Sequence, residues 1–172
     1  MAHQENELAF FYRCAGKTLT RHEVQQMAQY VQHGNTSTLT HCLAVAWYSY
    51  RLYRFLGFHG QERSLIRGAL LHDFYLYDWH DPGHGRWHGF YHPGIAARNA
   101  QECFGVNPLE LDIIEKHMWP LTVIPPRHRV AAIVCLVDKL CSLAEICRIP
   151  YAQFLRQLAQ QPHPPVNFPL AS

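Results

Sequence analysis

Apolar residues recur at helical spacing along most of the chain, and signals for β-strands are nearly absent. No segment alternates apolar and polar residues for long, and no Asn-Gly or Asp-Gly pair marks a hairpin turn. The sequence therefore predicts an all-α fold, a bundle of six to seven helices. The expected helices span residues 20–31, 37–56, 61–72, 93–104, 107–117 and 127–147, with a weaker one at 151–160.

Several of these helix ends carry recognisable capping residues. Thr20–Glu23 has the spacing of a capping box, which predicts a helix start. Asn107 followed by Pro108 is a favourable N-cap and first-turn pair. Gly57 and Gly105 follow apolar segments, as expected of residues that end helices.

Length and composition indicate one globular domain. The chain has 172 residues, of which 48% are hydrophobic and 16% charged, so wholesale disorder is excluded. We expect a single domain over residues 1–160, with its functional core at 37–145 and a Pro-rich tail at 161–172. The net charge of +2 is too small for a protein that binds long nucleic acids.

The sequence also predicts a soluble protein in a reducing compartment. The polar N-terminal segment lacks the apolar core of a signal peptide, and no stretch of 18 uncharged apolar residues is present. None of the six Cys belongs to a Cys-x-x-Cys pair, which is typical of buried free thiols. We therefore expect a cytoplasmic protein without membrane partners.

Histidine is the unusual residue type in this chain. It occurs 13 times, as often as Asp and Glu together, and points to metal or proton chemistry. Many of these residues lie in the long segment 74–92, which includes DWHDPGHGRWHGFYH. Long segments of this kind often carry function. His80 and His84 in this segment are either solvated or part of a lid over a site.

Two aspartates stand where an ionised carboxylate needs a compensating partner. His72 and Asp73 close the apolar run LIRGALL, and Asp138 lies within the apolar helix VAAIVCLVDKLCSLAEI. His41 lies on an apolar helix face. Backbone donors could satisfy Asp73, and a cationic side chain could pair with Asp138. Metal coordination is the alternative that would account for both aspartates.

The order of these four residues resembles the HD-domain superfamily of metal-dependent phosphohydrolases, which are all-helical. The similarity spans residues 37–145, and two later histidines extend it to the subclass with six ligands and two metal ions. The matching series H…HD…H…H…D comprises His41, His72, Asp73, His92, His117 and Asp138.

The resemblance implies a division of these ligands between two ions. His41, His72 and Asp138 would hold one ion together with Asp73. His92 and His117 would hold the second, and Asp73 would bridge the two. Neutral imidazoles with few carboxylates suit divalent transition metals, namely Fe, Mn, Zn, Ni or Co, better than Mg.

His88 competes with His92 for the second position. Gly89 and Pro93 indicate that this segment is not yet helical, so we assign the ligand to His92 and give His88 a contact with the substrate or with a ligand. We expect Asp73, His88 and Lys116 to take part in catalysis. The side chains expected to contact substrate are Arg86, His88, Lys116, Trp119 and Lys139.

Alternatives remain for several of these residues. Lys116 and Lys139 are neighbours of ligands on helices, so their side chains point about 100° away and would then lie at the surface. Aromatic residues near the motifs, such as Trp79 and Trp119, would form either a stacking wall for a nucleobase or ordinary packing.

The function that the resemblance implies is hydrolysis of a phosphoester of a nucleotide-like small molecule by a metal-bound hydroxide. Some six-ligand HD proteins are instead di-iron oxygenases acting on small organic substrates, and the same ligands serve both reactions. A non-catalytic HD binding module is a third hypothesis, which the full set of buried ligands disfavours. The sequence gives no indication of the oligomeric state.

Overall fold

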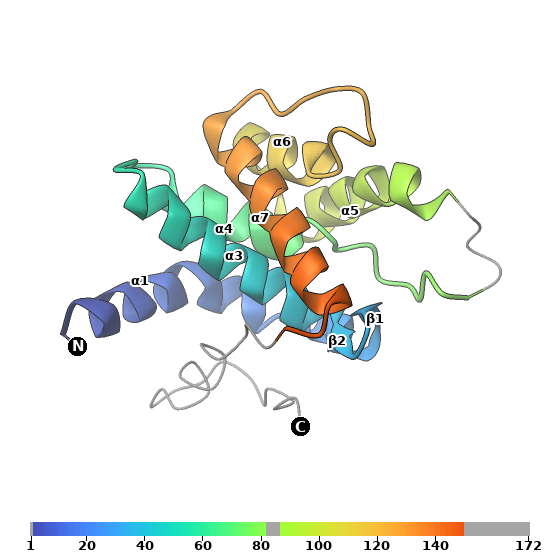
Figure 1. The fold of residues 1–172 in the computed structure, drawn as a ribbon, viewed down its shortest axis with the longest axis horizontal. Helices are drawn as coiled ribbons and strands as arrows, with labels where there is room; N and C mark the ends of the chain where they lie inside the picture. Colours follow the sequence, from blue (N-terminus) through green and yellow to red (C-terminus); the bar gives the residue numbers. More distant parts are fainter. Residues whose placement is uncertain (1, 82–86, 150–172) are drawn as a thin grey trace.

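The computed structural model describes residues 2–81 and 87–149, and their side chains from residue 7 onward. The predicted helix at 151–160, the tail at 161–172, His84 and Arg86 lie outside the described residues. The described chain contains seven α-helices, one 3-10 helix and one two-stranded hairpin (Figure 1), which confirms the predicted all-α fold. The elements are α1 Ala2–Leu19, α2 His22–Gln26, η1 Met27–Gln29, β1 Val31–His33, β2 Thr36–Ser37, α3 Thr38–Phe55, α4 Glu62–Leu71, α5 His88–Phe104, α6 Pro108–Lys116 and α7 Arg129–Ile146.

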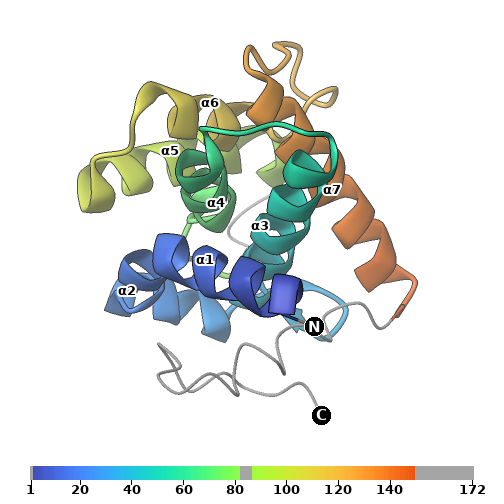
Figure 2. The same cartoon turned by 90° about the vertical axis from the view of Figure 1, so that its left-hand side faces the viewer.

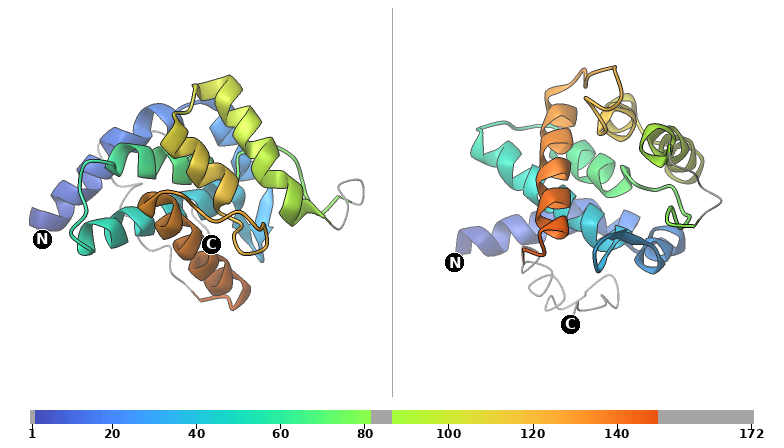
Figure 3. Two further views of the ribbon diagram at one scale, coloured as in Figure 1. Left: turned by 90° about the horizontal axis from the view of Figure 1, so that it is seen from above. Right: turned by 45° about the vertical axis from the view of Figure 1, so that its right-hand side comes forward.

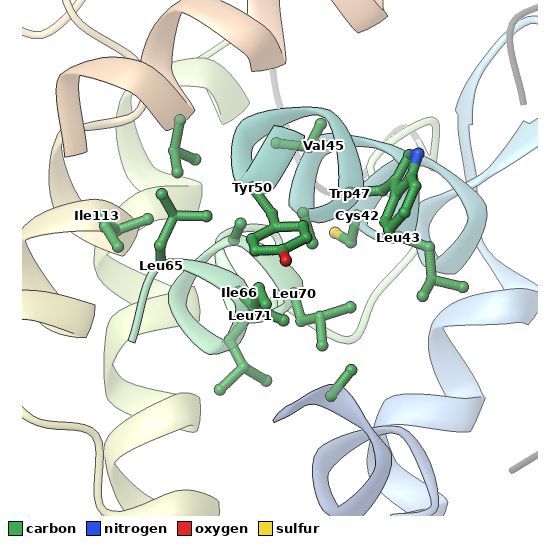
Figure 4. Close-up of a cluster of buried hydrophobic side chains, with 14 of the residues drawn as sticks. Cys42, Leu43, Val45, Trp47, Tyr50, Leu65, Ile66, Leu70, Leu71 and Ile113 are labelled. Atoms are coloured by element: carbon green, nitrogen blue, oxygen red, sulfur yellow. The ribbon is translucent and has the colours of Figure 1, made fainter. Parts of the chain in front are cut away.

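Helices α3 and α4 form the centre of the bundle. Helix α3 packs against α4 and α7, and α4 also packs against α1 and α6. Figure 2 shows α1 lying across one end of α3 and α4, with α5 and α6 at the opposite end. Apolar side chains from α3, α4 and α6 meet between these layers (Figure 4). Among them are Leu43, Leu65, Ile66, Leu70, Leu71 and Ile113.

Local signals account for several helix boundaries. Ser37 precedes α3 and its hydroxyl accepts a hydrogen bond from the Thr40 backbone N–H at 3.2 Å. Asn107 and Glu110 form a reciprocal capping box at the start of α6. Gly105 ends α5 in the left-handed conformation, with φ of 57°. These predicted boundaries are confirmed.

A glycine permits the close approach of α4 and α6. A Cβ placed on Gly68 would lie 2.7 Å from Ile113 Cδ1 and 3.3 Å from the Glu110 Cα. These distances are shorter than ordinary van der Waals contact, so Gly68 lets the two helices pack more tightly than any other residue would. Because α4 carries His72 at its end and α6 carries His117, this contact also helps position the candidate site.

The N-terminal region differs from the sequence prediction. Helix α1 was not expected, although Leu8, Phe11, Ala15 and Leu19 are buried along one of its faces at helical spacing. The predicted capping box at Thr20 does not form, because the Thr20 hydroxyl donates to the Lys17 carbonyl at 3.3 Å. Gly16 lies inside this helix and lowers its helix propensity, so the sequence signal for α1 is weak.

The predicted helix at 20–31 is wrong in its second half. In the structure, the short helix α2 is followed by the 3-10 helix η1, and the chain then forms β1, which pairs antiparallel with β2. The turn between these strands contains Gly34 with φ of 57°. Sequence reasoning missed the hairpin because each strand is only two or three residues long.

Helix α7 does not lie at the centre of the bundle, as its apolar sequence suggested. One face packs on α3 and α6, whereas Leu136, Leu140 and Leu143 on the other face are more than half exposed. No other described element covers that face (Figure 3). Among the described helices, none combines the length and apolar character needed to cross a membrane.

Candidate metal centre

The six predicted ligands come together in one buried cluster. His41 lies in α3, His72 and Asp73 follow the last turn of α4, and His92 lies in α5. His117 follows α6, and Asp138 lies in α7. All six side chains are almost completely buried, Asp138 being the most exposed at 6%.

Asp73 lies between two groups of histidines. Its Oδ2 atom is 3.2 Å from His72 Nε2 and 3.8 Å from His41 Nε2. Its Oδ1 atom is 3.1 Å from His92 Nε2 and 3.4 Å from His117 Nε2. One oxygen therefore faces each group, which is the geometry of a carboxylate that could bridge two cations.

Asp138 completes the first group. Its Oδ1 atom lies 3.0 Å from His41 Nε2 and 3.5 Å from His72 Nε2. Three sets of ligand atoms are each gathered within 4.8 Å. One comprises His41, His72 and Asp138, another Asp73, His92 and His117, and a third, Cys42 with His72 and Asp73, shares a residue with each of the first two. The described residues therefore contain a His/Asp cluster that could hold metal ions.

Backbone carbonyls orient three of the histidine rings. A carbonyl only accepts hydrogen bonds, so the Nδ1 atom facing it must carry a proton, and in a neutral ring Nε2 then keeps its lone pair for the interior of the cluster. The bonds join Nδ1 of His72 to Ala69 O at 2.8 Å, Nδ1 of His92 to His88 O at 3.0 Å and Nδ1 of His117 to Ile114 O at 2.8 Å.

Two of these lone pairs face each other. His92 Nε2 and His117 Nε2 are 2.8 Å apart, and neither nitrogen bears a proton in the neutral tautomer that its carbonyl selects. Such a pair is repulsive unless a cation lies against both atoms. In addition, His72 Nε2 and Asp73 Oδ1 are buried without a hydrogen-bond partner. The cluster therefore has the donor set and the unsatisfied atoms that a metal ion would fit.

The charges in the cluster are balanced through its histidines. Burial lowers the pKa of His41, but hydrogen bonds to Asp138 and Glu145 outweigh it and raise that pKa to about 10. Burial would raise the pKa of Asp73, but the His72 imidazolium holds it well below its usual range. Burial lowers the pKa of His117 to about 3, so its ring is neutral at pH 7 and can act as a ligand.

Glu145 is a member of the cluster that sequence reasoning missed. It is buried on α7, and His41 Nδ1 donates to its two carboxylate oxygens at 2.9 and 3.1 Å. This bond turns the Nε2 atom of His41 toward Asp138 and Asp73. Glu145 follows Asp138 by seven residues, so the helical repeat places both on one face of α7, and that spacing was the available signal.

A polar network from the hairpin supports Asp73. Gln32 on β1 donates from Nε2 to Asp73 Oδ2 at 2.6 Å, and its own Oε1 accepts from the Tyr75 hydroxyl at 2.6 Å and the Thr38 hydroxyl at 3.1 Å. Burial raises the pKa of Tyr75, which keeps it a hydrogen-bond donor. Sequence reasoning missed Gln32 because it missed the hairpin.

The cluster forms the floor of a cavity of about 770 Å³. Asp73, His92, His117 and Asp138 contribute to the floor. The remaining lining contains few charged groups, with Lys139 the only Lys or Arg among the described lining residues. Its largely apolar walls include Trp79, Met118, Pro120, Leu121 and Ile146. A volume of this size is typical of a small-molecule site.

Only some of the residues expected to contact substrate line the cavity. His88 and Lys139 line the cavity, and Lys139 Nζ donates to the His117 carbonyl at 2.7 Å. Lys116 and Trp119 do not line it. Lys116 pairs with Glu115 at 3.2 Å, and Trp119 is 43% exposed. Arg86 lies outside the described residues.

The expectation that the segment around His88 is not helical is wrong. Helix α5 begins at His88 and contains Pro93, so His88 and His92 share a face with i, i+4 spacing. Their rings stack with centroids 4.6 Å apart, and His88 Nδ1 lies 2.9 Å from the Tyr77 hydroxyl. Trp79 stacks on the His88 ring at 5.2 Å. His92 Nε2 nevertheless lies 3.1 Å from Asp73 Oδ1, which supports its assignment as the ligand.

Comparison with known proteins adds no relatives: no protein-family model, no curated protein and no solved structure matches this chain.

Proposed function

We propose that this protein is a metal-dependent phosphohydrolase of the HD-domain type, with two metal ions bound on either side of Asp73. The observation that carries the proposal is the position of this carboxylate, with Oδ2 toward His41 and His72 and Oδ1 toward His92 and His117. Among residues 7–81 and 87–149, no Lys or Arg pairs with these oxygens, and a buried carboxylate in such surroundings is suited to metal ions.

The donor set favours divalent transition metals. Four imidazoles and two carboxylates suit Fe, Mn, Zn, Ni or Co, whereas Mg prefers an all-oxygen shell and is less well matched. His41, His72, Asp138 and Asp73 would hold one ion, and His92, His117 and Asp73 the other. Bound ions would supply Lewis acidity, which activates water and offsets negative charge on a phosphoryl group.

The residues of the chain would orient the substrate and the ligands. Lys139, at the edge of the cavity, is placed to attract the phosphoryl charge, while its bond to the His117 carbonyl holds the turn that carries that ligand. Gln32 keeps the Asp73 carboxylate fixed in one rotation. The largely apolar walls would lower the polarity around the floor of the cavity, which would strengthen electrostatic interactions there.

The cavity supports a small phosphoester as substrate. It is large enough for a nucleotide-sized molecule, and Trp79 in its wall offers an aromatic edge that a base could contact. The net charge of the chain does not favour long nucleic acids.

The test is elemental analysis of anaerobically purified protein, followed by a phosphatase screen across nucleotides and simple phosphomonoesters with Mn, Fe, Co, Ni and Mg. The proposal predicts about two equivalents of metal and metal-dependent release of phosphate. Asp73→Asn should lose bound metal and activity, whereas His59→Ala, in the exposed α3–α4 loop, should lose neither. O₂ consumption without phosphate release would favour the di-iron oxygenase alternative instead.

A further inference from the structure

A second cavity, of about 300 Å³, is lined mainly by basic residues of α1 and α4. It shares no lining residue with the cavity above the metal cluster. Helix α1 packs against α4, and the ligands His72 and Asp73 directly follow the C-terminal end of α4. Its lining comprises Arg13, Cys14, Lys17, Thr18, Arg63 and Arg67.

Helical spacing makes the four cations converge. Arg13 and Lys17 are four residues apart on α1, and Arg63 and Arg67 are four residues apart on α4, so each pair shares one helix face. The two helices pack against each other, and all four side chains line the same hollow. Like charges at this spacing destabilise a helix, and here two such pairs meet.

Only one of the four cations is neutralised. Arg67 donates to both carboxylate oxygens of Glu110 at 3.0 Å and to the Phe104 carbonyl at 3.0 Å. Within residues 7–81 and 87–149, no carboxylate forms an ion pair with Arg13, Lys17 or Arg63. No Asp or Glu lines the cavity. Three positive charges therefore line a concave space into which the described residues bring no carboxylate. Glu62, whose charge reaches the lining residue Cys14, is itself paired with Arg54.

We propose that this cavity binds a small phosphate-bearing anion, separately from the metal centre. Arginine guanidinium groups match phosphate oxygens in a bidentate geometry, and a cluster of uncompensated cations in a hollow raises the local concentration of anions. The volume suits a group of the size of a diphosphate. None of the large apolar side chains exposed on the described surface belongs to this cavity, so a soluble anion fits it better than a membrane surface.

Binding is tested on the full chain after metal removal by a chelator. The probes are inorganic phosphate and methylenediphosphonate, whose P–C–P linkage phosphohydrolases do not cleave, and calorimetry and thermal unfolding report binding. The proposal predicts saturable binding of methylenediphosphonate that weakens as salt is added. Arg13→Gln combined with Arg63→Gln should lower the affinity at least 10-fold, and Lys17→Gln, made separately, should lower it several-fold.

Two control variants locate the site. Arg98→Gln removes an exposed arginine on α5, and Asp73→Asn alters the metal cluster. Both should bind the diphosphonate as the unaltered chain does. A bound anion should also slow alkylation of Cys14, which lines the cavity, without slowing that of the exposed Cys147.

Three results would overturn the proposal. Unchanged affinity in both the double variant and Lys17→Gln would show that the anion binds elsewhere. Loss of binding in Asp73→Asn would assign the anion to the metal centre. Binding to vesicles that contain phosphoinositides, without binding of either soluble probe, would mean that the basic residues recognise a membrane surface.

Discussion

Asp73 and His41 illustrate how single side chains determine the properties of the cluster. Asp73 faces both groups of histidines, and it needs Gln32 to fix its rotation. His41 needs Glu145, because only a bond at Nδ1 directs Nε2 toward the other ligands. Interactions behind metal ligands are known to affect metal affinity strongly.

Removing the charge of Glu145 should weaken metal binding. Glu145→Gln is expected to lower metal affinity by about 10- to 100-fold. Without its carboxylate partner, the His41 ring is less basic and its Nε2 atom binds a metal ion more weakly. Competition with a chromophoric chelator measures the change, with the exposed Glu102→Gln on α5 as the matched control. Equal affinities for the two variants would show that the Glu145 bond does not support a ligand.

The stability of the metal-free protein should fall as pH rises above neutrality. The pKa of His41 is raised from 6.5 to about 10, so protonated His41 stabilises the fold fully below pH 6.5, and this stabilisation is lost as the pH approaches 10. A bound metal ion would replace the proton and remove this dependence. Thermal unfolding between pH 6.5 and about 7.5, with and without chelator, stays below the ordinary titration range of thiols. If the chelated protein became more stable as the pH rose across this interval, the raised pKa of His41 would be contradicted.

At the residue scale, the sequence identified the ligands better than their partners. His72, Asp73 and Asp138 could be recognised because carboxylates are rare in apolar helices. Gln32 could not, because its role depends on a hairpin whose two strands are only three and two residues long and have weak local signals. The expected contacts of Lys116 and Trp119 depended on which way the turn after α6 leads, and no pattern of residue types determines that direction.

At the scale of elements, the position of the ligands depends on helix contacts such as that between α4 and α6. Sequence reasoning located α3, α4, α6 and α7 to within two residues at most ends, because their caps and apolar stripes agree. It failed for α1, whose pattern is interrupted by Gly16, and for the start of α5. Pro93 predicts a helix start at that position, whereas the helix begins at His88.

The contact at Gly68 predicts a stability change. Gly68→Ala should lower the free energy of unfolding by about 1–2 kcal/mol, because the added methyl group would lie 2.7 Å from Ile113 Cδ1 and would crowd the backbone at Glu110. The gain in helix propensity of about 1 kcal/mol only partly offsets this cost. Urea unfolding measures the effect.

The matched control is Gly94→Ala on α5, where an added Cβ meets nothing within 4 Å. That variant should be unchanged or slightly more stable. If both glycine variants behaved alike, the α4–α6 contact would not be limited by the side chain at position 68.

For the whole molecule, the metal cluster connects distant parts of the chain. His41 and Asp138 are separated by 97 residues in sequence, yet their side chains meet at 3.0 Å. Five of the seven described helices, α3 to α7, contribute or directly precede a ligand. A bound ion would therefore cross-link most of the fold.

This connection predicts a metal-dependent melting temperature. Chelation should lower the unfolding temperature by several degrees, and addition of Mn, Fe or Zn should restore it, because ligands that bind only the folded state stabilise it. Asp73→Asn should show no such response. A chelator effect of the same size in that variant would mean that metal binds elsewhere.

The central claim is that two metal ions lie on either side of Asp73, and anomalous X-ray scattering from crystals grown with Mn or Zn tests it directly. The account predicts two anomalous peaks about 3.5–4 Å apart. One should lie beside His41, His72 and Asp138, and the other beside His92 and His117. Density without a peak at Asp73 would contradict the account, and so would an arginine or lysine side chain occupying the space between these ligands.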